Sequence, residues 1–309
     1  FGRAREACEA VYGNAVFARG LIEFTNVCKN DCYYCGIRRS NRACERYRLT
    51  REQILACADA GWRAGFRTFV LQGGEDGYFS DDRMIELIQT IRKTYPDCAI
   101  TLSIGEKSYE TYRAFYEAGA NRYLLRHETF NARHYESLHP AGLTAQKRQQ
   151  CLWDLKSIGY QVGTGFMVGS PGQTAEHLAE DMLFIQKLNP QMVGIGPFIP
   201  HHDTPFAKEN AGTLELTLFM LGLLSLTIPS VLLPATTALG TIHPKGRELG
   251  ILAGANVVMP NLSPADVRGD YLLYDNKLCT GEEAAECRTE LEMRMNAIGY
   301  HVVTDRGDS

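Results

Sequence analysis

The sequence has no excess of basic residues. Lys and Arg number 32 against 36 Asp and Glu, which gives a formal net charge of -4 and a pI near 6.1. No positive field therefore steers nucleic acid to this protein, and an anionic ligand has to be held by local groups. Hydrophobic residues make up 45% and charged residues 22% of the 309, which is close to the average for globular proteins and argues against disordered and fibrous classes.

The sequence also lacks an uninterrupted apolar run long enough to span a membrane. In its longest apolar stretch, residues 216–233, Pro229 breaks the run and Glu215 stands directly before it, whereas a span needs about 20 continuous apolar residues. We expect a buried helix followed by a buried strand here, and no membrane contact. No low-complexity tract or linker divides the chain, so we expect one domain over residues 1–309.

Cysteine is not scarce, but its pattern is not that of a disulfide framework. Ten cysteines are spread over 309 residues, whereas small secreted proteins carry a dense set. No leader with charged, apolar and small-residue parts opens the sequence, and we expect a reducing, cytoplasmic location. The sequence starts at Phe1 and not at methionine, so we also expect that an initial segment preceded it, in which a targeting signal would be invisible.

Short β-rich apolar runs alternate with longer amphipathic segments along the chain. Helix starts lie between the runs: Thr50 with Gln53 has the form of a capping box, and Asp81 precedes apolar residues at helical spacing. Eight strand–helix pairs predict an α/β fold, a (β/α)8 TIM-type barrel over about residues 20–270, with short N- and C-terminal extensions, the latter covering about 271–309. The expected strands are residues 21–24, 68–72, 99–103, 122–125, 161–168, 192–197, 231–236 and 255–260.

Three cysteines with the spacing CxxxCxxC follow the first expected strand directly. Cys28, Cys32 and Cys35 therefore lie in a loop at the catalytic end of such a barrel. Thiolates bind iron–sulfur clusters, and a cubane cluster has four irons, so three thiolates leave one iron open to another ligand. The alternatives are a zinc knuckle, which normally needs four ligands, and cysteines that pack as small hydrophobes. Ligand count and position favour a [4Fe-4S] cluster.

This cysteine pattern, with the aromatic Tyr34 before the last cysteine, resembles the signature of the radical S-adenosylmethionine (SAM) superfamily. In that family the amine and carboxylate of SAM chelate the open iron, and one electron from the reduced cluster cleaves SAM to a 5′-deoxyadenosyl radical. The resemblance implies that SAM occupies the coordination position on the fourth iron, where a fourth thiol would otherwise bind.

Other expected strand ends also carry polar residues. Residues 72–76 read QGGED, and the glycines allow the backbone to approach a ligand closely. Two glycines alone indicate only a turn, but the segment resembles the GGE motif that contacts the SAM amine in the superfamily. The fourth run is part of RYLLRHET (122–129), in which we expect Arg122, Arg126, His127 and Glu128 close to the mouth, with the two arginines at matching strand parity. A surface ion-pair cluster is the alternative, but arginines facing one way suit a carboxylate or a similar planar anion.

A pair of histidines follows the sixth expected strand. His201, His202 and Asp203 lie between prolines in residues 197–205 and suggest a second metal. Adjacent histidines in a strand project to opposite faces, however, and cannot readily chelate one ion. We therefore expect a shaped loop.

Eight strings taken together resemble the HydE family of [FeFe]-hydrogenase maturases, and the resemblance covers nearly the whole chain. They include RYR, VLQGGED, RYLLRHET, GIGPFIPHHDTP, PATTALGT and GANVVMPN. The residues that the resemblance implies for SAM are Gln72, Gly73, Gly74, Glu75, Ser103, Glu128, Arg148 and Met259. Those implied for the substrate cavity are Gln72, Thr101, Arg122, Arg126, Thr236, Thr237, Tyr271 and Tyr274.

The resemblance further implies a reaction and partners. The substrate would be an organometallic iron species bearing CO, cyanide and cysteine, supplied by the maturase HydG, with HydF as a further partner. A reduced flavodoxin or ferredoxin would donate the electron, and no side chain would act as general base because the adenosyl radical is the reactive agent. The alternatives are a radical SAM mutase such as methylornithine synthase, and a non-catalytic iron–sulfur carrier.

One departure from the family concerns a second, peripheral cluster. Some HydE proteins bind it with CxxxxxxxCxxC near the C-terminus, whereas this sequence has Cys279, Cys287 and then Glu290. Because the third thiol is missing, we predict no stable second cluster.

Overall fold

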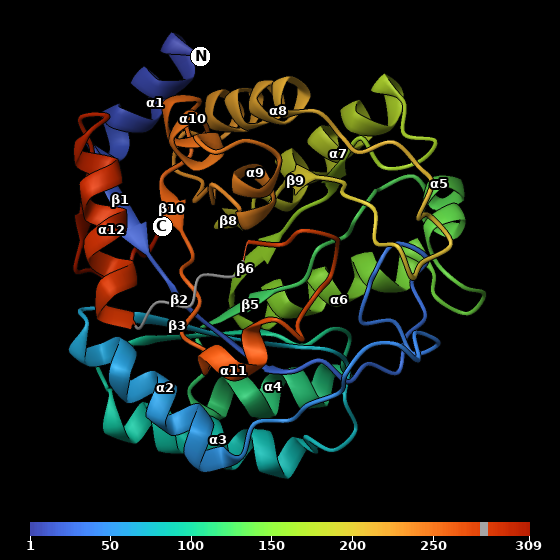
Figure 1. The fold of residues 1–309 in the computed structure, drawn as a ribbon, viewed down its shortest axis with the longest axis vertical. Helices are drawn as coiled ribbons and strands as arrows, with labels where there is room; N and C mark the ends of the chain where they lie inside the picture. The colour runs from blue at the N-terminus through green and yellow to red at the C-terminus, as the bar shows by residue number, and fades with distance from the viewer. Residues whose placement is uncertain (279–283) are drawn as a thin grey trace.

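A parallel sheet forms one wall of a barrel. The computed structural model describes residues 1–278 and 284–309. The six strands of this sheet pair in the order β2-β3-β4-β5-β6-β8, and Figure 1 labels all of them except β4. Gln72 of β3 aligns with Glu23 of β2 on one side and Ser103 of β4 on the other, so polar residues from neighbouring strands meet near their carboxyl ends. The strands are β2 (Gly20–Thr25), β3 (Thr68–Gly73), β4 (Ala99–Ser103), β5 (Arg122–Leu124), β6 (Gln161–Thr164) and β8 (Met192–Val193).

The expected fifth and sixth strands are each broken in the middle. Their second halves, β7 (Met167–Val168) and β9 (Gly196–Pro197), form a separate parallel pair. The break in the fifth strand includes Gly165, whose φ is +156°. A Cβ there would overlap the carbonyl oxygen of Gly194, so glycine allows the two backbones to approach closely.

Single bridges, not long strands, close the rest of the barrel. Leu232 pairs with Met192, and Pro234 pairs with Val257 of β10 (Val257–Val258). The expected strand at 231–236 is reduced to these two contacts, because Pro234 has no N–H to continue a ladder. A parallel bridge from Leu21 to Asn261 joins the last segment to β2. The predicted TIM-type α/β barrel is confirmed, with its second half more irregular than the spacing suggests.

Helices cover the outside of the strands. In Figure 1, α2, α3 and α4 lie together on one side of the sheet, while α8, α9 and α10 lie across the molecule. The predicted capping box at Thr50 is confirmed, and α3 starts at the expected Asp81 with Ser80 as its cap. The helices are α1 (Gly2–Tyr12), α2 (Arg51–Arg63), α3 (Asp81–Thr94), α4 (Tyr109–Ala118), α5 (Ala132–Leu138), α6 (Ala145–Ile158), α7 (Ala175–Leu188), α8 (Leu214–Thr227), α9 (Thr237–Ile242), α10 (Gly246–Leu252), α11 (Ala265–Arg268) and α12 (Ala284–Asn296).

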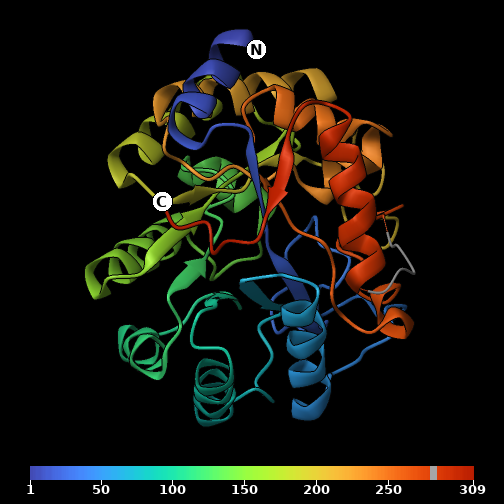
Figure 2. The same cartoon turned by 90° about the vertical axis from the view of Figure 1, so that its left-hand side faces the viewer.

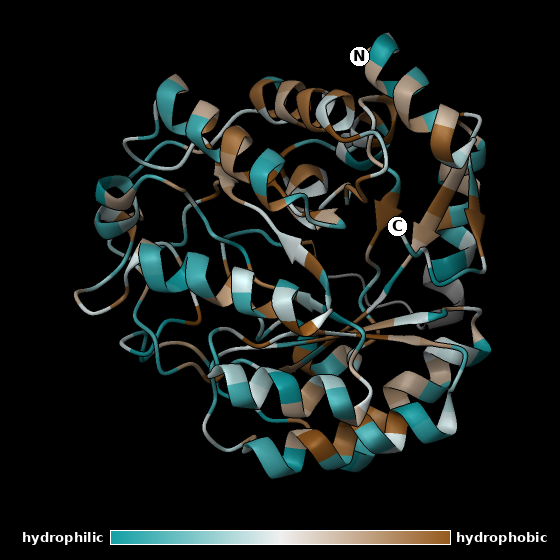
Figure 3. Cartoon of the chain, turned by 180° about the vertical axis from the view of Figure 1, so that it is seen from behind, coloured by the Kyte–Doolittle hydropathy of each residue, from teal (hydrophilic) through white to brown (hydrophobic). Residues whose placement is uncertain are grey.

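The longest apolar stretch of the sequence forms the buried helix that we expected. It is α8, which is largely brown in Figure 3 and has seven buried residues, including Leu221 and Leu224. Within residues 1–278 and 284–309, no helix is both long enough and apolar enough to cross a membrane.

Two short strands from the ends of the chain join the barrel, and the sequence pattern did not predict either. β1 (Ala15–Ala18) pairs in parallel with β10 and with β11 (His301–Val303). Figure 2 shows the red C-terminal segment running from β11 toward the green strands. There the buried Arg122 donates to the carbonyl oxygens of Arg306 and Gly307, both at 2.9 Å, and to the carboxylate of Asp308 at 2.6 Å. The segment thus covers the amino ends of the strands.

Replacing Arg122 is therefore expected to destabilise the fold. Arg122→Met removes the hydrogen bonds to the carbonyls of Arg306 and Gly307 and the ion pair with Asp308. Thr68 still donates to the first carbonyl, but the second keeps only a 3.5 Å contact with Arg19, so the free energy of unfolding should fall by about 2–4 kcal/mol. Arg113→Met is the matched control, because that side chain is 64% exposed and, among the described residues, its ion pair is with Glu117 one turn away. Denaturant unfolding of both variants measures the difference. Equal stability of the two would show that the C-terminal segment does not stabilise the barrel through Arg122.

Candidate functional site

A cavity of about 370 Å³ opens at the carboxyl ends of the strands. Cys28, Cys32 and Cys35 all line it and are each partly exposed. Its floor includes Leu124 and Met192, which also line a much smaller cavity below. The parallel strands place the cysteine loop and the other loops that follow them around this one opening.

The cysteine loop is held by backbone contacts. The side chain of Arg46 donates to the carbonyl oxygens of Asn26 (2.6 Å) and Ile37 (2.8 Å), which lie on either side of the three cysteines. The N–H of Gly36 donates to the carbonyl of Leu273 (2.9 Å), a residue of the segment that crosses the cavity mouth. Arg46 is a positioning residue that the spacing of the cysteines did not reveal.

The three thiols favour the protonated state in the absence of a cation. Burial raises the pKa of Cys32 to about 12, and it also raises the pKa values of Cys28 and Cys35. A bound metal favours the thiolate form and releases these protons. Three converging soft ligands in one loop therefore suit a metal cluster better than a disulfide or a hydrophobic core.

The two glycines after β3 allow close contact with the cysteine loop. A Cβ on Gly74 would overlap the carbonyl oxygen of Val27. The next residue, Glu75, donates its N–H toward the sulfur of Cys28 (3.4 Å), and its carboxylate pairs with the ammonium of Lys29 at 3.1 Å. The glycines thus permit close approach to the neighbouring loop, while their expected close approach to a ligand stays a prediction.

Charged side chains on the cavity wall are paired with one another. The guanidinium of Arg126 lies 3.2 Å from the carboxylate of Glu128, and Arg148 lies 2.9 Å from the carboxylate of Glu106. Nε of Arg126 and the hydroxyl of Thr236 are buried, and within the described residues they have no hydrogen-bond partner. These donors are available to an anionic or carbonyl-bearing ligand.

Most residues that the family resemblance implied for SAM or substrate come together around this cavity. They are Gln72, Gly73, Gly74, Glu75, Ser103, Arg126, Glu128, Arg148, Thr236, Thr237, Met259, Tyr271 and Tyr274.

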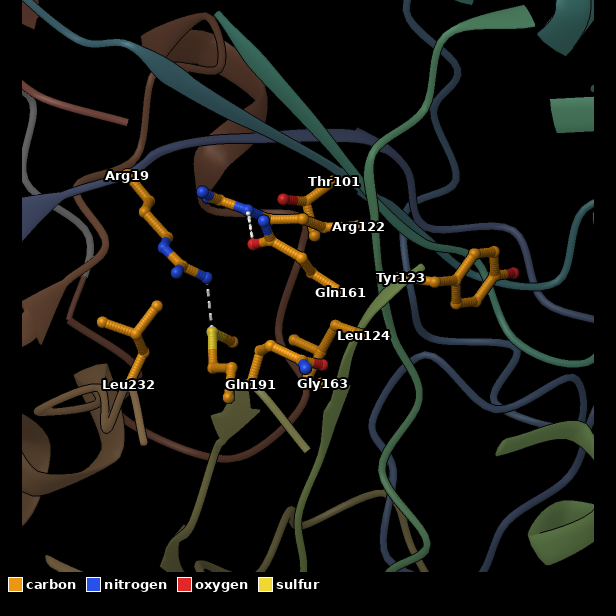
Figure 4. A pocket seen from close by; sticks show the side chains of 10 residues that line it. Arg19, Thr101, Arg122, Tyr123, Leu124, Gln161, Gly163, Gln191 and Leu232 are labelled. Atoms are coloured by element: carbon orange, nitrogen blue, oxygen red, sulfur yellow. Dashed lines mark hydrogen bonds between the residues drawn. The ribbon is translucent and has the colours of Figure 1, made fainter. Parts of the chain in front are cut away.

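Thr101 and Arg122 lie elsewhere. Figure 4 shows them with Arg19 and Gln161 around the smaller cavity, of about 10 Å³, at the amino ends of the strands. The expectation that Arg122 is close to the mouth is wrong, because it is the first residue of β5 and not the last. Matching parity with Arg126 indicates a shared face of the strand, but it does not indicate which end of the barrel a residue occupies.

A buried ion pair on the cavity wall was not predicted. The ammonium of Lys277 lies 2.6 Å from the carboxylate of Glu23 and donates to the carbonyl of Tyr271 at 2.8 Å. All three residues line the cavity. The sequence contains one indication of this pair, the acidic Glu23 inside the apolar run LIEF. Its partner could not be identified, because Lys277 lies 254 positions away in the sequence.

The two adjacent histidines lie side by side, contrary to the expectation from strand geometry. Their ring centroids are 4.5 Å apart, because they lie in a turn, and one atom of each lies within 4.8 Å of an oxygen of Asp275. Nδ1 of His201 accepts from the N–H of Asp203 (3.1 Å), and Nδ1 of His202 lies 2.6 Å from Asp275. A neutral His201 thus carries its proton on Nε2, the nitrogen that faces Asp275. These contacts are consistent with a loop in which hydrogen bonds fix the two histidines next to Asp275.

The residues considered for a second cluster are only partly described. Cys279 and the side chain of Cys287 lie outside the described residues. Glu290 belongs to α12 and lies 3.8 Å from Arg294 one turn later. The predicted absence of a second cluster stays a prediction.

The Radical SAM superfamily model matches residues 22–185, which is more than half of the chain. The "[FeFe] hydrogenase maturase subunit HydE" of Thermotoga maritima is 46% identical over 287 residues, covering 93% of this chain and 82% of that protein. The 3-methylornithine synthase of Methanosarcina acetivorans is 32% identical over 280 residues, covering 89% and 77% of the two chains.

Solved structures agree with this relationship. The crystal structure of methylornithine synthase (PylB) superposes with a TM-score of 0.86 at 28% identity, over 97% of this chain and 87% of that one. HydG, a maturase of the [FeFe]-hydrogenase, superposes with a TM-score of 0.82 at 19% identity, over 97% and 68%, which shows a shared fold. This chain therefore belongs to the radical SAM superfamily of enzymes and, within it, to the family of the [FeFe]-hydrogenase maturase HydE.

Proposed function

We propose that this radical SAM enzyme acts on an organometallic iron precursor that bears CO, cyanide and cysteine, during assembly of the [FeFe]-hydrogenase H-cluster. One observation carries the proposal: the three cysteines line the same cavity as Arg126 and Thr236, whose Nε and hydroxyl have no hydrogen-bond partner in the part of the chain that the structure describes. The 46% identity to a curated HydE supports it.

The cavity residues fit a [4Fe-4S] cluster and SAM. Cys28, Cys32 and Cys35 would bind three irons, and the raised pKa values of their thiols are consistent with a site that needs a cation. When bound, the reduced cluster supplies one electron that cleaves SAM to a 5′-deoxyadenosyl radical. No side chain needs to act as general base.

The wall around the cysteines would hold SAM by its polar groups. Glu128 is an acceptor suited to ribose hydroxyls, and Arg148 is a donor suited to the methionyl carboxylate. The backbone of Gly73 to Glu75 would receive the amine, with Ser103 and Met259 beside it. Arg148 is already balanced by Glu106, so its orientation is set before a ligand enters.

The substrate would lie deeper, between the cofactor and the floor. Arg126 and Thr236 would donate to its cyanide or carboxylate, with Gln72, Thr237, Tyr271 and Tyr274 completing the lining. Leu124 and Met192 form an apolar floor, which keeps water from a reactive intermediate. HydG as supplier, HydF as partner and a reduced flavodoxin or ferredoxin as electron donor follow from the family alone.

Methylornithine synthase is the second candidate, because its structure superposes over 97% of this chain. The two candidates share the cofactor and differ in substrate. Incubation of the reconstituted enzyme with lysine and SAM distinguishes them, since release of methylornithine would favour the mutase. A non-catalytic carrier is the third candidate and predicts no cleavage of SAM.

Reconstitution with iron and sulfide tests the cluster. The enzyme should take up about four irons per chain and, with dithionite and SAM, form 5′-deoxyadenosine. Cys32→Ala should lose both properties, because two thiolates cannot retain the cluster. Cys98→Ala, a buried cysteine outside the loop, should keep both. Wild-type levels of iron in Cys32→Ala would refute the cluster assignment, and about eight irons in the wild-type chain would refute the predicted lack of a second cluster.

Thr236→Val tests the substrate wall. The Thr236 hydroxyl has no partner among the described residues, so its removal should leave stability unchanged and weaken use of the HydG product about tenfold. Thr101→Val is the matched control: its hydroxyl is also buried without a described partner, but it lines the smaller cavity. The readout is 5′-deoxyadenosine formation as a function of substrate concentration. An equal effect of both variants, or none, would contradict the assignment of Thr236.

A further inference from the structure

Glu128 has a backbone conformation that is unfavourable for its residue type. Its φ is +63°, and among the described residues only two other non-glycine residues have positive φ, Asn189 and Asn276. Asparagine tolerates this left-handed region, whereas the conformation is unfavourable for glutamate by roughly 1–2 kcal/mol. Such a conformation persists only where the surrounding structure imposes it.

The carboxylate of Asp181 in α7 contacts residues on both sides of Glu128 in the sequence. Oδ1 of Asp181 accepts from the N–H of Phe130 at 2.5 Å and lies 3.2 Å from Nε2 of His127. The other ring nitrogen of His127 lies 2.8 Å from the hydroxyl of Thr164. The side chains of His127 and Asp181 are fully buried. The residue before Glu128 and the residue two after it are thus tied to the same oxygen.

Backbone and ring contacts complete the restraint. The N–H of Glu128 donates to the carbonyl of Gly165 at 3.0 Å, and the His127 ring packs edge-on against Phe184 of α7, with centroids 5.0 Å apart. Glu128 lines the cavity, but His127 and Asp181 do not. The pair can therefore affect a ligand only indirectly, through neighbouring residues that line the cavity, namely Glu128 and, before His127, Arg126.

The Asp181 carboxylate is also costly to bury. Its Oδ2 has no hydrogen-bond partner among the residues described, and an incompletely paired buried carboxylate destabilises a fold relative to apolar packing. Packing of α7 against the barrel does not require a carboxylate at this position. The restraint on Glu128 does require the Oδ1 oxygen.

We propose that Asp181, acting with His127, is a positioning residue that holds Glu128 in its left-handed conformation and thereby sets the affinity for a ligand with vicinal hydroxyls, the ribose of SAM. This inference rests on the role of Glu128 in the proposed function. In the held conformation Glu128 lines the cavity; its Oε2 accepts no hydrogen bond within the described residues and lies 3.2 Å from the guanidinium of Arg126. Without the restraint, the turn relaxes to negative φ and the carboxylate leaves this position.

The test is a double-mutant cycle on SAM affinity, measured by equilibrium dialysis of the cluster-reconstituted enzyme. Glu128→Ala and Asp181→Ala should each weaken SAM binding about tenfold, and the double variant should bind no more weakly than the worse single variant. Asp181→Asn keeps the oxygen that both donors use, so it should restore affinity to within about threefold of wild type. A crystal structure of Asp181→Ala should show Glu128 at negative φ.

Leu188→Ala is the control for general destabilisation. Leu188 is a fully buried residue of α7, so its truncation should lower the unfolding temperature without changing SAM affinity. If Asp181→Ala and Glu128→Ala act additively, if Asp181→Ala binds SAM normally, or if φ of residue 128 stays positive in Asp181→Ala, the positioning inference is wrong. If Glu128→Ala itself binds SAM normally, the role of Glu128 in the proposed function is wrong and the inference fails with it.

Discussion

The hydrogen bonds that join Leu21 to residues 260–262 close the barrel, and the site depends on this closure. The N–H of Leu21 donates to the carbonyl of Pro260 at 2.9 Å, and the N–H of Leu262 donates to the carbonyl of Leu21 at 2.7 Å. Because the chain closes on itself, residues as distant in sequence as Cys28 and Thr236 line one cavity. An open sheet would expose the thiols to solvent on one side and leave no wall opposite them.

Closure also creates an electrostatic constraint, since charges buried in the cavity wall need partners. Each cation on the wall lies beside a carboxylate: Arg126 beside Glu128, Arg148 beside Glu106, and Lys277 beside Glu23. Burial raises the pKa values of the thiols, which favours their protonated form where no cation is bound. The wall is thus balanced in charge before any ligand enters, and the ligand-binding groups are oriented in advance.

The regular half of the fold was predictable because its strands are continuous apolar runs with helix caps between them. The first four expected strands agree with β2 to β5 within about one residue at each end. The second half deviates where backbones approach closely at Gly165 and where Pro234 removes a donor. Short strands such as β11 form because they pair with another strand, so no local sequence pattern predicts them.

The sequence by itself determined the chemistry of this protein: three thiols in one loop, a glycine pair beside them and polar residues at the strand ends, because ligand type and local spacing are properties of contiguous residues. Only the tertiary structure decided which end of the barrel each polar residue occupies, how Lys277 meets Glu23 and how Asp181 constrains Glu128. Those relations join residues from about 50 to 250 positions apart, and they depend on the register and closure of the whole sheet.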